Sequence, residues 1–222
     1  MAGRFITFEG GEGTGKSTHA ALLAERLKTL GLDVVRTREP GGSPGAEILR
    51  HVILSGAAKP LGVEAEALLF GAARADHVRH IIAPALARGD WVICDRFIDS
   101  SRVYQGTLGR LDPLFLRALE RVTVADLAPD LTFILDVPAE VGLERARRRM
   151  SEHAPDRFES ESNAFHESLR EAYQALAASE PARCILIDAT QSKAVVAERI
   201  WSTVQERLNP ATAPTARAGV AS

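Results

Sequence analysis

The feature that most constrains the fold is a glycine-rich segment close to the start of the chain. It consists of Gly10, Gly11, Glu12, Gly13, Thr14, Gly15, Lys16, Ser17 and Thr18. Residues 10–17 fit the phosphate-loop pattern Gly-x4-Gly-Lys-Ser/Thr. An apolar run of strand length precedes the segment at residues 5–8, and leucines spaced as on one helix face follow it at residues 23–30. A strand, a phosphate loop and a helix in this order indicate an α/β fold.

The residue types of this segment suit the binding of a nucleoside triphosphate. Glycines let successive backbone N–H groups converge on a phosphate, and the start of the following helix adds partial positive charge. Lys16 is expected to reach the β- and γ-phosphates, and the Ser17 hydroxyl is expected to bind Mg²⁺. A plain glycine-rich turn is disfavoured, because it would not need this fixed pattern between a strand and a helix. The motif alone leaves a kinase, a GTPase switch and a motor-like ATPase open.

Apolar runs of strand length alternate with longer helical stretches along the rest of the chain. Strands are expected at residues 5–8, 34–35, 91–94, 131–137 and 184–187. Helices are expected at about residues 45–55, 63–87, 112–125, 138–150, 161–178 and 192–208. This alternation favours a five-stranded parallel sheet that is covered by helices on both faces. Sheets of this kind bind ligands at the carboxyl ends of their strands.

The composition argues against several classes of function. The 27 Lys and Arg residues nearly balance the 29 Asp and Glu residues, so the net charge is −2, and no nucleic-acid partner is expected. Cys94 and Cys184 lie in apolar runs and are expected to be buried thiols rather than disulfide or zinc ligands. No signal peptide and no apolar run of about 18–20 residues is visible, so a cytoplasmic protein without a membrane partner is expected.

Two segments differ from the rest of the chain. Residues 149–161 are charged and poor in apolar side chains, and they are expected to form a loop or a mobile lid. Residues 209–222 contain mainly Ala, Thr, Pro and Gly, and they are expected to be a disordered tail because they offer little apolar surface to bury. The remainder, residues 1–208, is expected to form one domain.

Polar residues follow two further strands. The segment Arg38-Glu39-Pro40-Gly41-Gly42 follows the second strand, and its turn places a loop where a second substrate would lie. The segment Asp95-Arg96-Phe97 follows the third strand, where Asp95 suits either a carboxylate close to the magnesium or a helix N-cap. Phe70 and Arg74 lie one helical turn apart, and they offer either core packing or a ring to stack on beside a fork of donors.

These motifs in this order resemble those of the thymidylate kinases, and the resemblance runs from the first strand to about Leu208. The motifs are Phe8-Glu9-Gly10, Arg38-Glu39-Pro40-Gly41-Gly42, Phe70 with Arg74, Asp95-Arg96-Phe97, Tyr104-Gln105-Gly106, Pro129-Asp130-Leu131, Leu135-Asp136-Val137 and Ile187-Asp188-Ala189. The resemblance implies a P-loop kinase fold and phosphorylation of dTMP to dTDP. It also implies ATP as phosphoryl donor, Mg²⁺ as cofactor and a homodimer.

The resemblance assigns five residues to the nucleoside of the acceptor, dTMP. Phe70 would stack on thymine, and Arg74 would donate to its carbonyl edge. Ser101 and Gln105 would face the ring-nitrogen edge. Tyr104 would pack beside the sugar, where a ribose 2′-hydroxyl would clash.

The resemblance also assigns residues to the phosphates. Arg50 and Arg96 would hold the phosphate of dTMP, with Glu39 nearby. Lys16 and Arg96 would neutralise charge during transfer, and Asp95 would act at the magnesium. The attacking phosphate oxygen is already ionised near neutral pH, so no strong general base is required.

Arginine is absent from the variable positions of the phosphate loop but abundant around the lid. The lid region carries Arg145, Arg147, Arg148, Arg149 and Arg157, and this resembles the bacterial lid-arginine form of the family. Phosphoryl transfer spreads negative charge that positioned cations stabilise. Arg149 and Arg157 bracket the lid and are the expected catalytic arginines, while others of the five would simply complement the helix dipole.

Three alternative functions stay open at this point. A kinase for another nucleoside or nucleoside monophosphate would share the fold, and turnover of a substrate panel would distinguish it. A GTPase switch is disfavoured because the chain has no Asn-Lys-x-Asp motif to bind guanine. A catalytically idle dimer is disfavoured because Lys16, Ser17 and Asp95 are intact.

Overall fold

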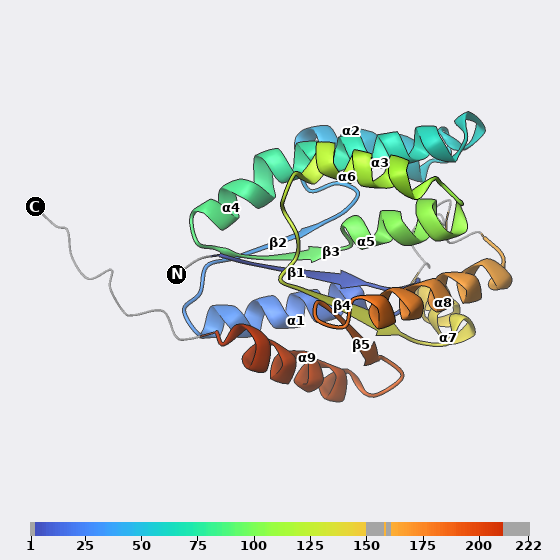
Figure 1. Ribbon diagram of the computed structural model, residues 1–222. Coiled ribbons are helices and arrows are strands. Elements are labelled where there is room, and N and C mark those ends of the chain that lie inside the picture. Colours follow the sequence, from blue (N-terminus) through green and yellow to red (C-terminus); the bar gives the residue numbers. More distant parts are fainter. Residues whose placement is uncertain (1–2, 150–157, 159–160, 211–222) are drawn as a thin grey trace, which may run out of the picture.

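Five parallel strands form the centre of the computed structural model, in the order β2-β3-β1-β4-β5 (Figure 1). The strands are β1 (Arg4–Glu9), β2 (Val34–Arg38), β3 (Trp91–Asp95), β4 (Leu131–Asp136) and β5 (Cys184–Asp188). Strands β3 and β4 are buried along nearly their whole length, as is typical of a parallel sheet covered on both faces. The predicted sheet is confirmed, and each strand overlaps its expected range.

The structure describes residues 3–149, 158 and 161–210. Arg157, most of the expected lid and the tail beyond residue 210 lie outside these residues, as does the side chain of Arg149. Across the described ranges, no helix is both long enough and apolar enough to cross a membrane.

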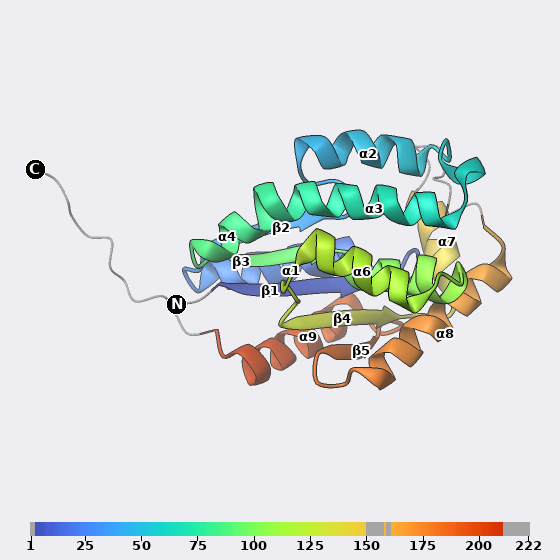
Figure 2. The ribbon, with the colours of Figure 1, turned by 45° about the horizontal axis from the view of Figure 1, so that its top comes forward.

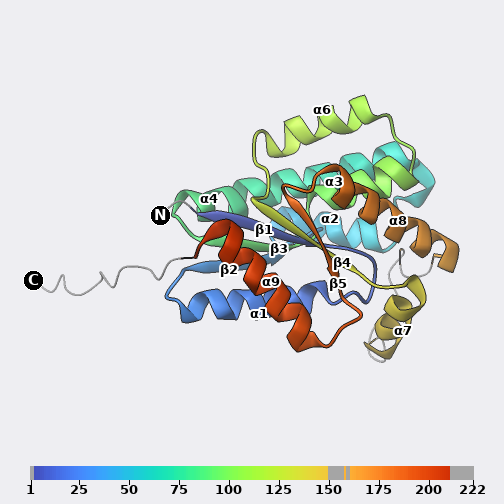
Figure 3. The same cartoon turned by 60° about the horizontal axis from the view of Figure 1, so that its bottom comes forward.

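Helices α1 (Lys16–Thr29) and α9 (Lys193–Leu208) lie side by side on one face of the sheet (Figure 3). Leu27 of α1 and Ile200 of α9 pack with Ile6 and Phe8 of β1 in one buried cluster. Because side chains alternate along a strand, Glu9 at the end of β1 comes out on the opposite face. This alternation therefore aims a carboxylate at the layer that holds the rest of the site.

The opposite face carries the larger set of helices. They are α2 (Pro44–Leu54), α3 (Val63–His77), α4 (Ala83–Ala87), α5 (Ile98–Ser101), α6 (Pro113–Val124) and α8 (Asn163–Ser179). Phe5 of β1 packs edge-on against Phe97 at 4.8 Å between ring centroids, which fixes the start of α5 on the sheet. Helices α2, α3 and α6 form the outer layer here (Figure 2). Helix α7 (Ala139–Arg149) follows β4 at the edge of the site.

Two helical segments differ from the expected pattern. The single helix expected at residues 63–87 is α3, then the π-helical turn η2 (Val78–Ile82), then α4. Residues 98–108 had no expected helix, yet α5 runs directly into the π-helical segment η3 (Arg102–Leu108). A short 3₁₀ helix, η1 (Lys59–Leu61), leads into α3. Short π-helical turns are frequent at functional sites, and η3 carries two of the expected acceptor residues.

Two glycines let the phosphate loop lie against neighbouring backbone. Gly13 has φ +68°, and a Cβ there would lie 1.8 Å from the carbonyl oxygen of Gly142 in α7. Gly10 has φ +130°, and a Cβ there would lie 2.5 Å from the carbonyl oxygen of Leu135 in β4. Only glycine fits both positions, so the sequence of the loop places it tightly between β4 and α7.

Candidate active site

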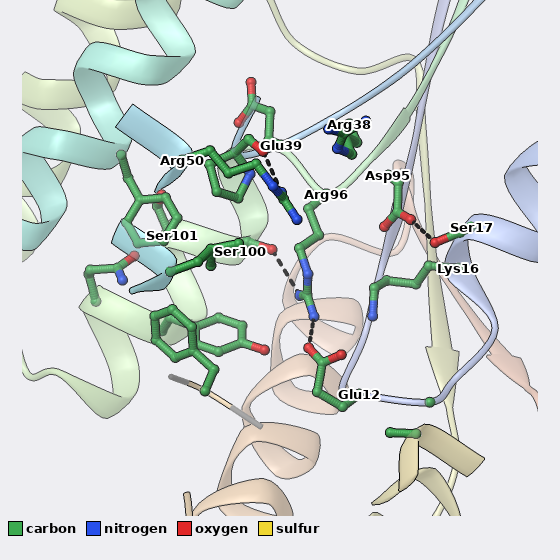
Figure 4. Close-up of a pocket in the computed structure, with 18 of the residues that line it drawn as sticks. Glu12, Lys16, Ser17, Arg38, Glu39, Arg50, Asp95, Arg96, Ser100 and Ser101 are labelled. Atoms are coloured by element: carbon green, nitrogen blue, oxygen red, sulfur yellow. Dashed lines mark hydrogen bonds and ion pairs between the residues drawn. The ribbon is translucent and has the colours of Figure 1, made fainter. Parts of the chain in front are cut away.

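One cavity of about 420 Å³ lies at the carboxyl ends of the central strands. Its lining includes Glu12, Lys16, Ser17, Arg38, Glu39, Arg50, Phe70, Asp95, Arg96, Ser100, Ser101, Tyr104 and Gln105. The phosphate loop, the turn after β2, the turn after β3, and helices α2, α3, α5 and η3 therefore meet at one place (Figure 4). Of the remaining loop residues, Gly10, Gly11 and Thr14 border a smaller cleft toward α8, and Thr18 is exposed on α1.

Lys16 is buried inside the phosphate loop. Its Nζ donates to the carbonyl oxygens of Gly10, at 3.1 Å, and Gly11, at 2.6 Å. Burial lowers the pKa of Lys16, and the nearby Arg96 guanidinium lowers it further. An ammonium that is held by neutral carbonyl groups in a buried loop is a strong donor for an incoming anion.

Ser17 and Asp95 form a pair of oxygen ligands beside Lys16. The Ser17 hydroxyl donates to Asp95 Oδ2 (Figure 4). The next helix, α5, begins only at Ile98 and is preceded by Phe97, so Asp95 does not cap it. Hydroxyl and carboxylate oxygens are the ligands that Mg²⁺ prefers, and it is commonly held by one or two protein groups together with phosphates. This donor pair fits a magnesium ion whose remaining ligands are phosphate oxygens and water. The described residues contain no cluster of three or more His, Cys, Asp or Glu side chains suited to a metal.

Arg96 has an unusual backbone conformation and a crowded guanidinium. Its φ is +68°, in the left-handed region that side-chain-bearing residues seldom adopt. The guanidinium donates to Glu12 Oε1 at 2.5 Å and to the hydroxyl oxygens of Ser100 and Tyr173 at 3.3 Å each. Burial disfavours the charge on Glu12, but Lys16 and Arg96 outweigh that effect and lower its pKa to about 2.

Glu9 lies behind Arg96 and holds the turn in place. Its carboxylate accepts from the backbone N–H groups of Phe97 at 2.8 Å and Ser100 at 3.2 Å. It also accepts from the hydroxyls of Ser100 at 2.6 Å and Tyr173 at 2.9 Å. Burial, reinforced by nearby Asp99, raises the pKa of Glu9 to about 7. The strained backbone of Arg96 is therefore anchored on one side by a buried carboxyl group.

Arg74 lies directly behind the lining residues rather than among them. Its Nε donates to Glu39 Oε2 at 2.7 Å, and its two terminal nitrogens donate to the Ser101 hydroxyl and the Phe97 carbonyl at 3.0 Å each. The other oxygen of Glu39 lies 3.1 Å from His77 Nδ1. Arg74 thus ties together the turn after β2 and the start of α5, and Ser101 carries its effect to the cavity.

Arg50 reaches the cavity from α2. Its Nη1 donates to the Pro40 carbonyl at 2.6 Å. Arg38, Arg50 and Arg96 all line the cavity (Figure 4). Three guanidinium groups around one cavity favour an anionic ligand.

Comparisons with known proteins agree on one family. The sequence model of the thymidylate kinase family matches residues 8–200. Thymidylate kinases of Bradyrhizobium sp. (strain ORS 278) and Nitrobacter winogradskyi are each 61% identical to this chain, and the alignments cover 95% and 96% of it and 93% of each relative. A crystal structure of thymidylate kinase from Ehrlichia chaffeensis matches with a TM-score of 0.74 at 32% identity, over 92% of this chain and all of that one. The chain belongs to the thymidylate kinase family.

Family membership determines the reaction class. The chain is a phosphotransferase that uses ATP as phosphoryl donor and converts dTMP to dTDP. The fold, too, is that of the P-loop kinases, as the solved thymidylate kinase structure shows. The earlier alternatives, a GTPase switch and an idle dimer, do not agree with these relatives.

The structure describes only some of the arginines in and near the expected lid. Arg145 donates to the Ala189 carbonyl at 3.0 Å, Arg147 is exposed, and Arg148 forms an exposed ion pair with Glu144. Arg157 and the side chain of Arg149 lie outside the described residues, so their expected catalytic roles stay predictions.

Several residues at the site were not singled out from the sequence. Tyr173 on α8 contacts both Glu9 and Arg96, although nothing in its local pattern separates it from an ordinary core tyrosine. Phe158 is buried, and its ring centroid lies 5.2 Å from that of Tyr104 and 6.2 Å from that of Phe70. Phe158 could have been found from the sequence, because it is the only Phe, Tyr or Trp in the charged segment 149–161.

Proposed function

We propose that this cavity brings ATP and dTMP together, with the phosphate loop on the donor side and α2, α3, α5 and η3 on the acceptor side. The observation that supports this most is the shared lining, because Lys16, Asp95 and Arg96 border the same cavity as Phe70 and Gln105. A phosphate-loop lysine and an aromatic platform in one cavity suit direct transfer between two nucleotides.

On the donor side, Lys16 and the backbone N–H groups of the loop bind the ATP phosphates. Within the described part of the chain, the ammonium of Lys16 bonds only to carbonyl oxygens of the loop, which it can exchange for phosphate oxygens. Ser17 and Asp95 would hold Mg²⁺. A magnesium ion bound there supplies positive charge that offsets the charge of the transferred phosphoryl group.

On the acceptor side, Arg96 and Arg50 bind the phosphate of dTMP, with Glu39 nearby. The dTMP oxygen attacks in its ionised form, so the protein supplies position and positive charge rather than a base. Glu12 orients Arg96 through their 2.5 Å ion pair, and its low pKa keeps that pair charged at physiological pH. Arg149 and Arg157 complete the positive charge around the transferred phosphoryl group.

The nucleoside of dTMP lies between α3 and η3. Phe70 stacks on thymine, Ser101 and Gln105 face its ring-nitrogen edge, and Tyr104 packs beside the sugar. The positions of Phe70, Ser101, Tyr104 and Gln105 along one cavity support this arrangement. From behind this lining, Arg74 is the proposed donor to the carbonyl edge of thymine, since three of its five N–H groups bond to described residues of the protein and two do not.

The enzyme is also proposed to work in the cytoplasm as a homodimer. Large apolar side chains are exposed on α2, α3 and α6, the outer layer of Figure 2. They include Ile48 at 70%, Leu68 at 51%, Leu114 at 67% and Val122 at 80% exposure. A layer with this many exposed apolar residues favours a packed helix interface.

A coupled assay of ADP release with dTMP, dUMP, dCMP and thymidine tests the function. Rapid turnover is expected with dTMP, and the substitution Lys16→Ala is expected to remove nearly all transfer while dTMP binding changes only a few-fold. The matched control is Lys28→Ala, on the exposed end of the same helix, which is expected to leave turnover unchanged. A Lys16→Ala variant with near-normal turnover would contradict the donor assignment, and preference for dCMP or thymidine would contradict the acceptor assignment.

A further inference from the structure

A buried acid outside the cavity bonds to one of the residues that line it. Glu66, on α3, is only 4% exposed and does not line the cavity. Its Oε1 accepts a hydrogen bond from Gln105 Nε2 at 2.9 Å. Gln105, on η3, is 2% exposed and does line the cavity. The side chain of Glu66 is therefore linked to the site through Gln105.

This bond determines which end of the Gln105 amide is available to a ligand. The Glu66 oxygen accepts, so the amide turns its NH₂ group toward Glu66. The amide carbonyl oxygen of Gln105 is then left for the cavity. No donor among the described residues bonds to that oxygen. An acceptor at the wall of the cavity is matched by a donor from the ligand.

Ser101 is oriented in the complementary way. It lies four residues before Gln105 on the same helical run, and its hydroxyl oxygen accepts from the Arg74 guanidinium at 3.0 Å. A guanidinium can only donate, so the hydroxyl hydrogen of Ser101 remains to be donated. The cavity thus presents a donor and an acceptor whose directions are set by two buried side chains, Arg74 and Glu66.

We propose that Glu66 is a positioning residue for base specificity, because it holds the Gln105 carbonyl toward the base. This inference rests on the proposed placement of dTMP between α3 and η3. The thymine edge carries an N–H beside a carbonyl oxygen. The N–H matches the acceptor of Gln105, and the carbonyl oxygen matches the donor of Ser101. Cytosine carries a bare ring nitrogen beside an amino group. Its ring nitrogen, an acceptor, would face the carbonyl oxygen of Gln105, and its amino group, a donor, would face the hydroxyl hydrogen of Ser101. Glu66 thereby disfavours a cytosine base without touching it.

The substitution Glu66→Gln tests the proposal with almost no change of shape. A glutamine at this position can either donate or accept, so the Gln105 amide is free to turn its NH₂ group toward the base. The assay compares kcat/KM for dTMP and for 5-methyl-dCMP, which differ only at the ring-nitrogen edge. We expect kcat/KM for dTMP divided by kcat/KM for 5-methyl-dCMP to fall at least tenfold in the variant. Glu64→Gln, at an exposed position on the same helix, is the matched control and is expected to keep the ratio.

A structural role for Glu66 gives a different result. If Glu66 only fastens α3 to η3, Glu66→Gln lowers kcat/KM for both substrates by the same factor, and the proposal is overturned. In a Gln105→Ala background, Glu66→Gln is expected to cause no further change in the ratio, and an equal change there would also overturn it. Failure of the underlying placement is distinguishable, because a wild-type enzyme that does not prefer dTMP over 5-methyl-dCMP contradicts the proposed function itself.

Discussion

The buried carboxyl group of Glu9 makes the stability of the protein depend on pH in a predictable direction. Its pKa is about 7 in the folded chain, against an ordinary value of 4.5. The folded state binds this proton more tightly, so the contribution of Glu9 to the free energy of unfolding is largest below pH 4.5. It falls as the pH rises and levels off above pH 7. For these two pKa values, the loss between pH 5 and pH 8 is about 2.5 kcal/mol.

The substitution Glu9→Gln isolates this contribution. Glutamine keeps the shape of the side chain and, like a protonated carboxyl group, offers an acceptor and a donor to its neighbours, but it cannot ionise. Urea unfolding, followed by the fluorescence of Trp91 and Trp201, gives the free energy of unfolding of both proteins at several pH values. The free energy of unfolding of Glu9→Gln minus that of the wild type is expected to rise by about 2.5 kcal/mol from pH 5 to pH 8.

The substitution Glu64→Gln, at an exposed position, controls for the loss of one negative charge. Its free energy of unfolding is expected to differ from that of the wild type by a nearly constant amount between pH 5 and pH 8. If the difference in the free energy of unfolding between Glu9→Gln and the wild type is also independent of pH, the reasoning is refuted. That result would mean that Glu9 keeps one protonation state between pH 5 and pH 8. A difference that falls with rising pH would mean that the four donors around Glu9 lower its pKa more than burial raises it.

Three further predictions concern the active site. Phe70→Ala is expected to weaken dTMP binding in calorimetry by about 1–3 kcal/mol, the value of a base–aromatic stack, with ATP binding little changed; a loss of thermal stability alone would make Phe70 a core residue. Tyr104→Ala is expected to improve the kcat/KM of the ribose monophosphate relative to dTMP by about tenfold to a few hundredfold; an unchanged ratio would place Tyr104 away from the sugar. Arg149→Ala or Arg157→Ala is expected to lower kcat by about 10³-fold with smaller changes in either KM; near-wild-type rates in both and in the double variant would shift the role to Arg145, Arg147 or Arg148.

The strands could be predicted because their signal is local. In each strand, a run of apolar residues bounded by polar residues or glycines is enough, and the structure agrees with every expected position to within a few residues. Helix α5 could not be predicted in this way. Its sequence, Ile98-Asp99-Ser100-Ser101, has no helical period, and Phe97 before it provides no side-chain cap. Instead, Glu9 accepts the N–H groups of Phe97 and Ser100, so the helix begins where a distant strand supplies the cap.

The contrast between local signals and contacts made by distant elements also separates the predicted site residues from those that were missed. Lys16, Ser17, Asp95 and Arg96 belong to short contiguous motifs whose chemistry is readable in the sequence. Tyr173 contacts Glu9 across 164 positions, and that contact depends on β4 lying beside β1, with α8 packed against β4 and β5. Strand order is a property of the whole sheet, so no local pattern could have joined these two residues.

Glu12 shows why a variable motif position can still be specific. The phosphate-loop pattern leaves this position open, since it requires only glycines, lysine and a hydroxyl residue. In the folded chain, Glu12 is the carboxylate partner of Arg96, a partly buried cation on a strained backbone. Removing one member of a pair that is largely withdrawn from water leaves the other charge poorly compensated, which costs more than the pair itself contributes. The choice of residue 12 is therefore set by the turn after β3, some eighty positions away, rather than by the phosphate that the loop binds.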